Sequence, residues 1–285
     1  MPVTPLFQTQ LLGMVRNDLG FKLFEAALDG ARTLMSFWCG QVTSTMKADG
    51  SPVSDADHAA DAAVRQSLKR LGVDAALVSE EGVTGHAADT EMFLLLDPLD
   101  GTKDFLDHGP EFCVCLAAIH RGRAVAGAIV APALKRAWFA GETCFAVALD
   151  GALEPEGAPR VLHMANRPRT EAPQALISRR NGDAKSEAAL RLCGVSSMKP
   201  ASSAIKFGLL AEGFADIHVR HGQTMAWDIA AGDAILTAAG GLVRNVDGAP
   251  LSYDNADQDF RNPPFVAVSR ADLLPTVLSA VQRAS

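Results

Sequence analysis

Four apolar runs of strand length follow one another between Phe112 and Leu149, and they constrain the fold more than any other feature of the sequence. They are separated by turn signals at Arg121-Gly-Arg123, Ala131-Pro132 and Gly141-Glu-Thr143. Apolar runs of this length, joined by turns this short, are typical of neighbouring antiparallel strands. The segment therefore predicts an antiparallel meander.

Two helical patterns precede the meander. Apolar residues recur at helical spacing from Asp18 to Trp38 and stop before Gly40, which predicts an amphipathic helix. A polar loop follows, and a second helical pattern begins with Ser54 as a candidate N-cap and Asp57 at the capping-box position. The chain therefore enters its sheet from two helices.

The rest of the chain alternates strand and helix patterns. The stretch from Asp150 to Pro173 holds four prolines and few bulky apolar residues, so we place a boundary there between halves of residues 1–150 and 151–285. Short buried strands are predicted before the meander at 75–79 and 92–96. Beyond the boundary, strands are predicted at 175–178, 214–219 and 265–269, and helices at 183–192, 204–212, 229–239 and 273–281.

Composition excludes several classes of function. The 26 Lys and Arg residues against 33 Asp and Glu give a net charge of -7 with no basic block, which argues against a nucleic-acid polymer or an anionic membrane as partner. No apolar run approaches the roughly 20 residues of a membrane span, and no signal segment is recognisable, so we expect a cytoplasmic protein.

Scattered cysteines in odd number fit reduced thiols better than a disulfide framework. Two of them stand two residues apart in an apolar run and share one face of a strand. This pair lacks a second pair at metal-site spacing, which favours small buried hydrophobic residues. The cysteines are Cys39, Cys113, Cys115, Cys144 and Cys193.

The most informative segment runs from Phe93 to Thr102. A buried strand delivers two carboxylates, Asp97 and Asp100, into a turn that Pro98 and Gly101 are expected to shape. Like charges this close raise each other's energy unless a cation lies between them, and hard carboxylate oxygens suit Mg²⁺. The segment therefore predicts a metal site.

Other acids stand in comparable places. Glu80-Glu81 ends the preceding predicted strand, and Asp228 opens a later helix. Singly, each acid also has an ordinary structural interpretation: Asp100 as a turn residue, Asp228 as a helix N-cap, and Glu80-Glu81 as a solvated strand end. Together with Thr102, which can begin a helix whose amides attract an anion, they favour a shared site.

Three segments resemble the signature segments of the inositol monophosphatase family of Mg²⁺-dependent, lithium-sensitive phosphatases: Glu80-Glu81, Asp97-Pro-Leu-Asp-Gly-Thr102 and Trp227-Asp-Ile-Ala-Ala-Gly232. The loop from Lys47 to Asp57 is also similar to that family. The fuller string from Asp97 to Phe105 resembles bacterial 3'(2'),5'-bisphosphate nucleotidases of the CysQ type, which remove the 3'-phosphate from adenosine 3',5'-bisphosphate. Such an activity belongs to sulfur metabolism.

The resemblance implies an α+β fold, the layered αβαβα sandwich of the sugar phosphatases, with the active site between the two halves and a homodimer as the assembly. It implies roughly two or three Mg²⁺ ions per site. The implied metal ligands are Glu80, Asp97, the Leu99 carbonyl, Asp100 and Asp228, with Asp57 acting through water. The implied roles at the substrate are orientation of the attacking water by Glu80 and Thr102, and contacts from Gly101, Thr102, Ser203, Lys206, Arg220 and Asp228.

Arg220 bears on the choice of substrate. Inositol phosphatases generally carry a glutamate there, whereas an arginine can hold a second phosphate with paired donors. Lys206 completes a clamp for the 5'-phosphate if it converges with Arg220. The alternative interpretation is that Lys206 is a solvated helix residue. His218 and His221 flank Arg220. They either line the mouth of the substrate site or simply lie at an exposed strand end. Ala204 and Asp104 depart from the nucleotidase pattern, which has serine and glutamate there.

The sequence therefore predicts a Mg²⁺-dependent phosphomonoesterase that converts adenosine 3',5'-bisphosphate to AMP and phosphate through metal-activated water. The alternative is an inositol-1-monophosphatase or a broad sugar-phosphate phosphatase. In haloacid dehalogenase phosphatases the nucleophilic Asp precedes a second Asp by two positions, and the spacing of three between Asp97 and Asp100 would misplace the general acid. The hypothesis of a binding protein that has lost catalysis predicts that some metal-ligand residues are missing. Every expected acid is present in this sequence.

Overall fold

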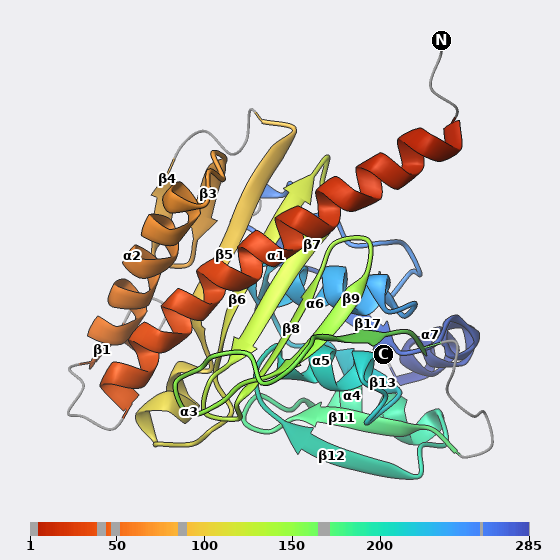
Figure 1. Ribbon diagram of the computed structural model, residues 1–285. Helices are drawn as coiled ribbons and strands as arrows, with labels where there is room; N and C mark the ends of the chain where they lie inside the picture. The colour runs from red at the N-terminus through yellow and green to blue at the C-terminus, as the bar shows by residue number, and fades with distance from the viewer. Residues whose placement is uncertain are drawn as a thin grey trace.

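The computed structural model stacks its elements in five layers, in the order helices, sheet, helices, sheet, helices (Figure 1). This arrangement confirms the expected α+β layered sandwich. The structure describes residues 5–38, 44–46, 52–84, 90–164, 172–256 and 259–284. Lys47 and Cys39 lie outside these ranges.

The larger sheet has the strand order β10-β9-β8-β7-β6-β5-β3-β4. The strands from β6 to β9 pair antiparallel with their neighbours in sequence, so the predicted meander is confirmed. The pair β3 and β5 is parallel. The bounds are β3 (Ala76–Ser79), β4 (Gly82–Thr84), β5 (Met92–Asp100), β6 (Cys113–His120), β7 (Arg123–Ala131), β8 (Arg136–Ala140), β9 (Cys144–Ala148) and β10 (Arg160–Leu162).

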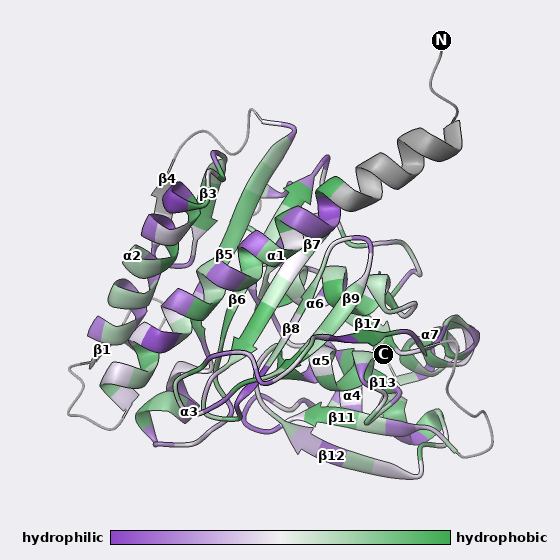
Figure 2. Cartoon of the chain, in the orientation of Figure 1, coloured by the Kyte–Doolittle hydropathy of each residue, from purple (hydrophilic) through white to green (hydrophobic). Residues whose placement is uncertain are grey.

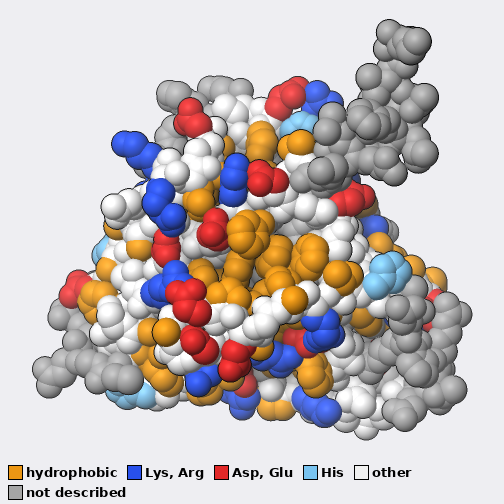
Figure 3. Space-filling view, viewed as in Figure 1, with side chains coloured by type: hydrophobic (Ala, Val, Ile, Leu, Met, Phe, Trp, Pro, Cys, Tyr) orange, Lys and Arg blue, Asp and Glu red, His pale blue; other side chains and the backbone are white. Residues whose placement is uncertain are grey.

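Two helices cover the outer face of this sheet, α1 (Pro5–Trp38) and α2 (Asp55–Arg70). The first begins 13 residues earlier than the apolar stripe indicated, because Pro5 is tolerated in the first turn. The Phe24 ring stacks on Phe139, which stacks on Phe145, with centroids 5.0 and 4.9 Å apart. Apolar side chains accordingly gather at the centre of this face (Figure 3).

The predicted start of α2 is confirmed. A short hairpin of β1 (Ser44–Met46) and β2 (Pro52–Ser54) leads into the helix. The backbone N–H and hydroxyl of Ser54 both donate to Asp57 Oδ2, at 2.9 and 2.6 Å. Across the described residues, no helix combines the length and the apolar content that crossing a membrane requires.

The smaller sheet has the order β12-β11-β13-β17-β15, in which β11 pairs parallel with both β12 and β13. Helices α5 and α6 lie between the sheets, and α4 and α7 cover the outer face. The bounds are β11 (Gln174–Ser178), α4 (Ala184–Leu192), β12 (Ser197–Ala201), α5 (Ile205–Ala211), β13 (Ile217–Arg220), α6 (Ala226–Ala238), β15 (Leu242–Asn245), β17 (Phe265–Val268), η4 (Ala271–Leu273) and α7 (Leu274–Ala284). A two-stranded pair joins β14 (Thr224–Met225) and β16 (Arg261–Asn262).

Two strands of this sheet carried no signal in the sequence. The edge strand β12 reads Ser-Met-Lys-Pro-Ala, and a proline within a run argues against a central strand. Strand β15 is only four residues long and directly follows Gly240-Gly241, which marks the end of α6. Both strands are held by their parallel or antiparallel neighbours rather than by their own propensity.

The central strands of the larger sheet are apolar on both faces, as the green strands in Figure 2 show. Side chains alternate between faces along a strand. Cys113 and Cys115 of β6 therefore point to the core around α5 and α6, whereas Val114 and Leu116 point to the core beneath α1 and α2. The prediction that the two cysteines share one buried face is confirmed.

Two glycines allow close packing of the inner helices, Gly208 of α5 against β8 and Gly232 of α6 against α5. A Cβ atom at Gly208 would collide with the Trp138 ring, and one at Gly232 would collide with the Phe207 ring. Gly232 closes the Trp-Asp-Ile-Ala-Ala-Gly segment, so this part of the motif has a packing role. The close approach fixes the first turn of α6, which carries Asp228.

Substituting Gly232 by alanine tests this packing. We expect Gly232→Ala to lower the free energy of unfolding by about 1–3 kcal/mol, because overpacking outweighs the gain of about 1 kcal/mol in helix propensity. The matched control Gly151→Ala lies in an exposed turn with open space around it, and its effect should stay within about 0.5 kcal/mol. Urea denaturation measures both values, and equal values would contradict the account.

Candidate active site

An extra residue in β5 places Asp97 and Asp100 on the same face of the sheet. Asp97 pairs opposite Cys115 and Asp100 pairs opposite Cys113. Three residues along β5 therefore match only two residues along β6. Side chains three residues apart on a regular strand point to opposite faces, and the irregularity reverses this. The expected turn at Pro98 is therefore wrong, because the strand runs on to Asp100 through a bulge.

Local hydrogen bonds hold this bulge. Asp97 Oδ1 accepts a bond of 3.0 Å from the Leu99 N–H, and the Leu99 carbonyl accepts one of 3.1 Å from Thr102 Oγ1. Gly101 follows with a left-handed φ of 97°, and a Cβ there would collide with Ser203 Oγ. The chain then enters the short helix α3 (Thr102–Leu106). Only glycine fits both requirements at position 101.

Glu80 reaches the same place from the neighbouring strand. Because β3 and β5 run parallel, their carboxyl ends meet at one edge of the sheet, and the Glu80 N–H donates to the Leu96 carbonyl at 3.1 Å. The next side chain, Glu81, is only 6% exposed. The interpretation of Glu80-Glu81 as a solvated strand end is therefore wrong.

Asp228 comes from the far side, on the first turn of α6. Its Oδ2 accepts a 2.8 Å bond from the Met225 N–H, so Met225 is the N-cap and Asp228 is the third helical residue. The alternative interpretation of Asp228 as the helix N-cap is therefore wrong, because Met225 holds that position. The aspartate is instead buried beside the pocket, and burial raises its pKa well above the usual value, with the charge of Asp100 raising it further.

The predicted site residues come together around one pocket of about 300 Å³. Asp57 is the exception, because it is buried in the first turn of α2 and does not line the pocket. The pocket suits a small molecule and lies where the two sheets meet. Its lining includes Glu80, Asp97, Leu99, Asp100, Gly101, Thr102, Ser203, Lys206, Arg220 and Asp228.

Buried aspartates in and behind this pocket resist ionisation. Burial raises the pKa of Asp97 well above its usual value, and the charges of Glu80 and Asp100 raise it further. Burial also raises the pKa of Asp100, although Lys206 opposes that shift. The pKa of Asp57 rises to about 6, mainly through burial. These buried aspartates therefore favour the protonated state unless a bound cation compensates their charge.

These groups fit a hard divalent cation. Carboxylate and carbonyl oxygens are the ligands that Mg²⁺ prefers, and the Leu99 carbonyl keeps a second lone pair beside its bond from Thr102. In the part of the chain that the structure describes, no three carboxylates bring ligand oxygens within 4.8 Å of one another. The carboxylate oxygens are therefore spread along the pocket.

Lys206 and Arg220 converge on the same pocket. Lys206 is 7% exposed, so the alternative of a solvated residue is wrong, and its Nζ donates to the Ser203 carbonyl at 2.7 Å. Arg220 donates from Nη1 to the Asn181 carbonyl, and its buried Nε has no partner among the described residues. Burial lowers the pKa of both groups.

Ser203 has a structural task as well as a place in the lining. Its hydroxyl is placed to donate to the carbonyl oxygens of Asp100 and Glu111, at 3.1 and 3.2 Å. This contact ties the start of α5 to the end of β5. It also places the Ala204 N–H, which donates to Asp100 Oδ2.

Sequence reasoning missed two arginines in the lining. Arg180 bonds to Asp104 at 3.1 Å and to Asp107 at 2.8 Å, and Arg179 pairs with Glu111 at 2.6 Å. Both stand in the loop between β11 and α4, where only their adjacency in the sequence gave a signal. The Asp104 carboxylate, which departs from the nucleotidase pattern, is thus the partner of Arg180.

His218 is another lining residue. It is 2% exposed, so an exposed strand end is the wrong interpretation. Its Nδ1 lies 3.0 Å from the Leu176 carbonyl. Burial and the charge of Lys206 lower its pKa to about 3, so the ring is neutral at physiological pH.

A model of the inositol monophosphatase family matches residues 21–283. The chain belongs to the inositol monophosphatase family. Three curated relatives give the context within it. The 3'(2'),5'-bisphosphate nucleotidase CysQ of Shigella flexneri is 36% identical over 221 residues, which is 77% of this chain and 86% of that protein. CysQ of Buchnera aphidicola is 31% identical over 253 residues, or 86% and 92%.

The third relative carries a different name within this family. The histidinol-phosphatase of Mycobacterium tuberculosis is 30% identical over 241 residues, covering 82% of this chain and 90% of that protein. Among solved structures, CysQ from Bacteroides thetaiotaomicron superposes with a TM-score of 0.76 at 29% identity, covering 90% of this chain and 99% of that one. The resemblance seen in the sequence is confirmed.

The raised pKa of Asp97 predicts that the stability of the fold depends on pH. A carboxyl whose pKa is raised by folding stabilises the fold while protonated, and this stabilisation is lost as the pH rises through the folded pKa. Asp97→Asn keeps the Oδ1 acceptor for Leu99 and cannot ionise. In metal-free buffer at pH 8 we expect it to raise Tm, at about 2–4 °C per kcal/mol, and to leave Tm unchanged at low pH where Asp97 is protonated.

Differential scanning fluorimetry in chelator measures this difference. Asp74→Asn, at an exposed position, is the matched control and should not change Tm at either pH. A lower Tm for Asp97→Asn at pH 8 would show that the Asp97 charge is compensated within the chain.

Proposed function

We propose that the protein is a Mg²⁺-dependent phosphomonoesterase that removes the 3'-phosphate from adenosine 3',5'-bisphosphate and releases AMP and phosphate. The observation that carries this proposal is the charge arrangement in one pocket. Carboxylates from three distant segments, Glu80, Asp97 to Asp100 and Asp228, share the pocket with two cations. These are the buried Lys206 and the half-buried Arg220, and neither forms an ion pair among the described residues. The CysQ relatives support the choice of substrate.

The residues divide into ligands and orienting groups. Glu80, Asp97, Asp100, Asp228 and the Leu99 carbonyl hold the ions, with Asp57 acting through water from behind. Bound Mg²⁺ supplies charge neutralisation and activation of water near neutral pH. The Thr102 hydroxyl and Glu80 orient the attacking water, and the Gly101 and Thr102 amides bind the phosphate.

The two halves of the chain contribute different parts. Residues 1–150 supply most ligands, and residues 151–285 supply Asp228 and the contacts to the rest of the substrate, although β10 of the second half completes the first sheet. Lys206 and Arg220 bind the 5'-phosphate, to which Arg220 offers its unpaired Nε. Ser203 fixes the backbone on which Lys206 lies.

A phosphate-release assay tests the activity. With Mg²⁺ we expect release from adenosine 3',5'-bisphosphate, and with chelator none. Loss of a group that only orients a metal ligand costs about 10- to 100-fold, so Asp97→Asn, which alters a ligand itself, should lower kcat/KM by more than about 100-fold. Asp74→Asn is again the control. Release that persists in chelator, or in Asp97→Asn at the wild-type rate, would refute the proposal.

The choice of substrate depends on Arg220. Arg220→Glu replaces an attraction by a repulsion and should cost about 2 kcal/mol or more for the bisphosphate, which is about 30-fold or more in kcat/KM. Simple monophosphates should lose far less. Arg283→Glu, on the exposed side of α7, is the matched charge reversal. Equal losses on bisphosphates and monophosphates would show that Arg220 does not select the second phosphate.

The same assay decides the alternatives. Inositol 1-phosphate and sugar monophosphates have no second anion to meet Lys206 and Arg220. L-histidinol phosphate, the substrate class named for one relative, carries an ammonium group that these cations repel. We therefore expect lower kcat/KM for all of them. Faster turnover of any one would replace the nucleotide in this proposal.

A further inference from the structure

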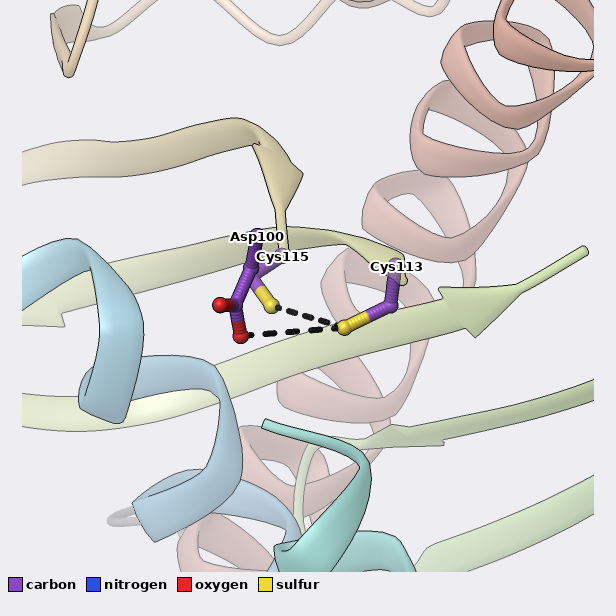
Figure 4. Close-up of side chains that lie close together, drawn as sticks. All are labelled: Asp100, Cys113 and Cys115. Atoms are coloured by element: carbon purple, nitrogen blue, oxygen red, sulfur yellow. Dashed lines mark hydrogen bonds between the residues drawn. The ribbon is translucent and has the colours of Figure 1, made fainter. Parts of the chain in front are cut away.

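A pair of thiols lies directly against Asp100 (Figure 4). Cys113 Sγ is 3.7 Å from Cys115 Sγ and 3.8 Å from Asp100 Oδ2. The three ligand atoms all lie within 4.8 Å of one another, and both cysteine side chains are fully buried. No other group of three acidic, cysteine or histidine side chains in the described ranges is gathered so closely.

These separations match the edges of a tetrahedral thiolate site. With metal–sulfur bonds of about 2.3 Å and metal–oxygen bonds of about 2.0 Å, tetrahedral angles place two sulfurs about 3.8 Å apart and a sulfur and an oxygen about 3.5 Å apart. The two separations at Cys113 therefore already suit a shared ion, and the third, between Cys115 and Asp100, lies within 4.8 Å. Thiolates select soft or borderline cations, whereas Mg²⁺ prefers oxygen.

We propose that Asp100, Cys113 and Cys115 form a site for a thiophilic divalent cation, with Zn²⁺ and Cd²⁺ as the chemical class. Each thiol releases its proton to solvent as its sulfur binds the ion, and a water molecule completes the tetrahedron. Asp100 lines the pocket and gives the ion a route to the sulfurs. The site shares Asp100 with the hard-metal site under Proposed function, but it requires no phosphatase activity.

The strand geometry favours a disulfide between Cys113 and Cys115 less than it favours a shared ion. Residues i and i+2 of a strand are about 6.6 Å apart at Cα, near the upper limit for a disulfide. The pairing of β6 with β5 and β7 holds Cys113 and Cys115 in the extended backbone. An ion between the sulfurs leaves them at their present separation, whereas a disulfide requires them to approach to about 2.05 Å.

Cadmium titration in excess Mg²⁺ tests the site on the full chain. We expect one Cd²⁺ per chain, a thiolate-to-metal charge-transfer band in the ultraviolet, and release of about two protons per ion. The variant Cys113→Ala/Cys115→Ala should lose the band. The matched control, with Cys39, Cys144 and Cys193 all replaced by alanine, keeps only the pair and should retain it.

Two further measurements keep the test decisive. Cadmium nuclear magnetic resonance on the wild type should give a shift typical of mixed sulfur and oxygen ligands, even if the double variant does not fold. Asp100→Asn should keep the band and weaken Cd²⁺ binding by about tenfold or more. A denatured wild type should show all five thiols free.

Several outcomes would overturn the site: no band in the wild type, a band that survives in a folded Cys113→Ala/Cys115→Ala variant, or a band lost from the triple variant. Two missing thiols in the denatured chain would show a disulfide instead. Because the readout is binding, a chain that binds Cd²⁺ but releases no phosphate refutes the phosphatase alone.

Discussion

The bulge between Asp97 and Asp100 is the constraint on which the rest of the site depends. A regular strand would turn one of these carboxylates toward the outer helices, and the extra residue turns both toward α6. Burial and mutual repulsion then oppose their ionisation, so a bound cation or protonation stabilises this corner of the fold. Parallel pairing of β3 and β5, and the close packing of α5 on α6, add Glu80 and Asp228 to that corner.

Lys206 and Arg220 share the pocket with the carboxylates, and the Lys206 charge opposes the rise in the pKa of Asp100. Lys206 and Arg220 are held by carbonyl oxygens rather than by ion pairs within the described ranges, and Arg179 and Arg180 are paired with acids at the rim. A pocket with anionic and cationic ends suits a substrate that bridges metal ions at one phosphate and side chains at another. The layered fold makes this arrangement. The larger sheet supplies Asp97 and Asp100, the smaller sheet supplies Arg220, and the helices between them supply Lys206 and Asp228.

Much of this was predictable from local patterns. The meander, the capping box at Ser54 and the metal-site segment each follow from residues close together in the sequence, whose spacing fixes strand, cap or turn. Features that depend on distant residues could not be predicted from local patterns. These are the register that makes residues 97–100 a bulge, the pairing of Arg180 with Asp104, and the approach of Cys113 to Asp100. Strand β12 was missed because its neighbours, not its composition, make it extended.

The most direct test of the central claim is an anomalous difference map from crystals of the protein grown with Mn²⁺. The account predicts density for ions between the carboxylates of Asp97, Asp100 and Asp228, with Glu80 reaching the same group. Ions bound only elsewhere, with these side chains turned apart, would contradict it.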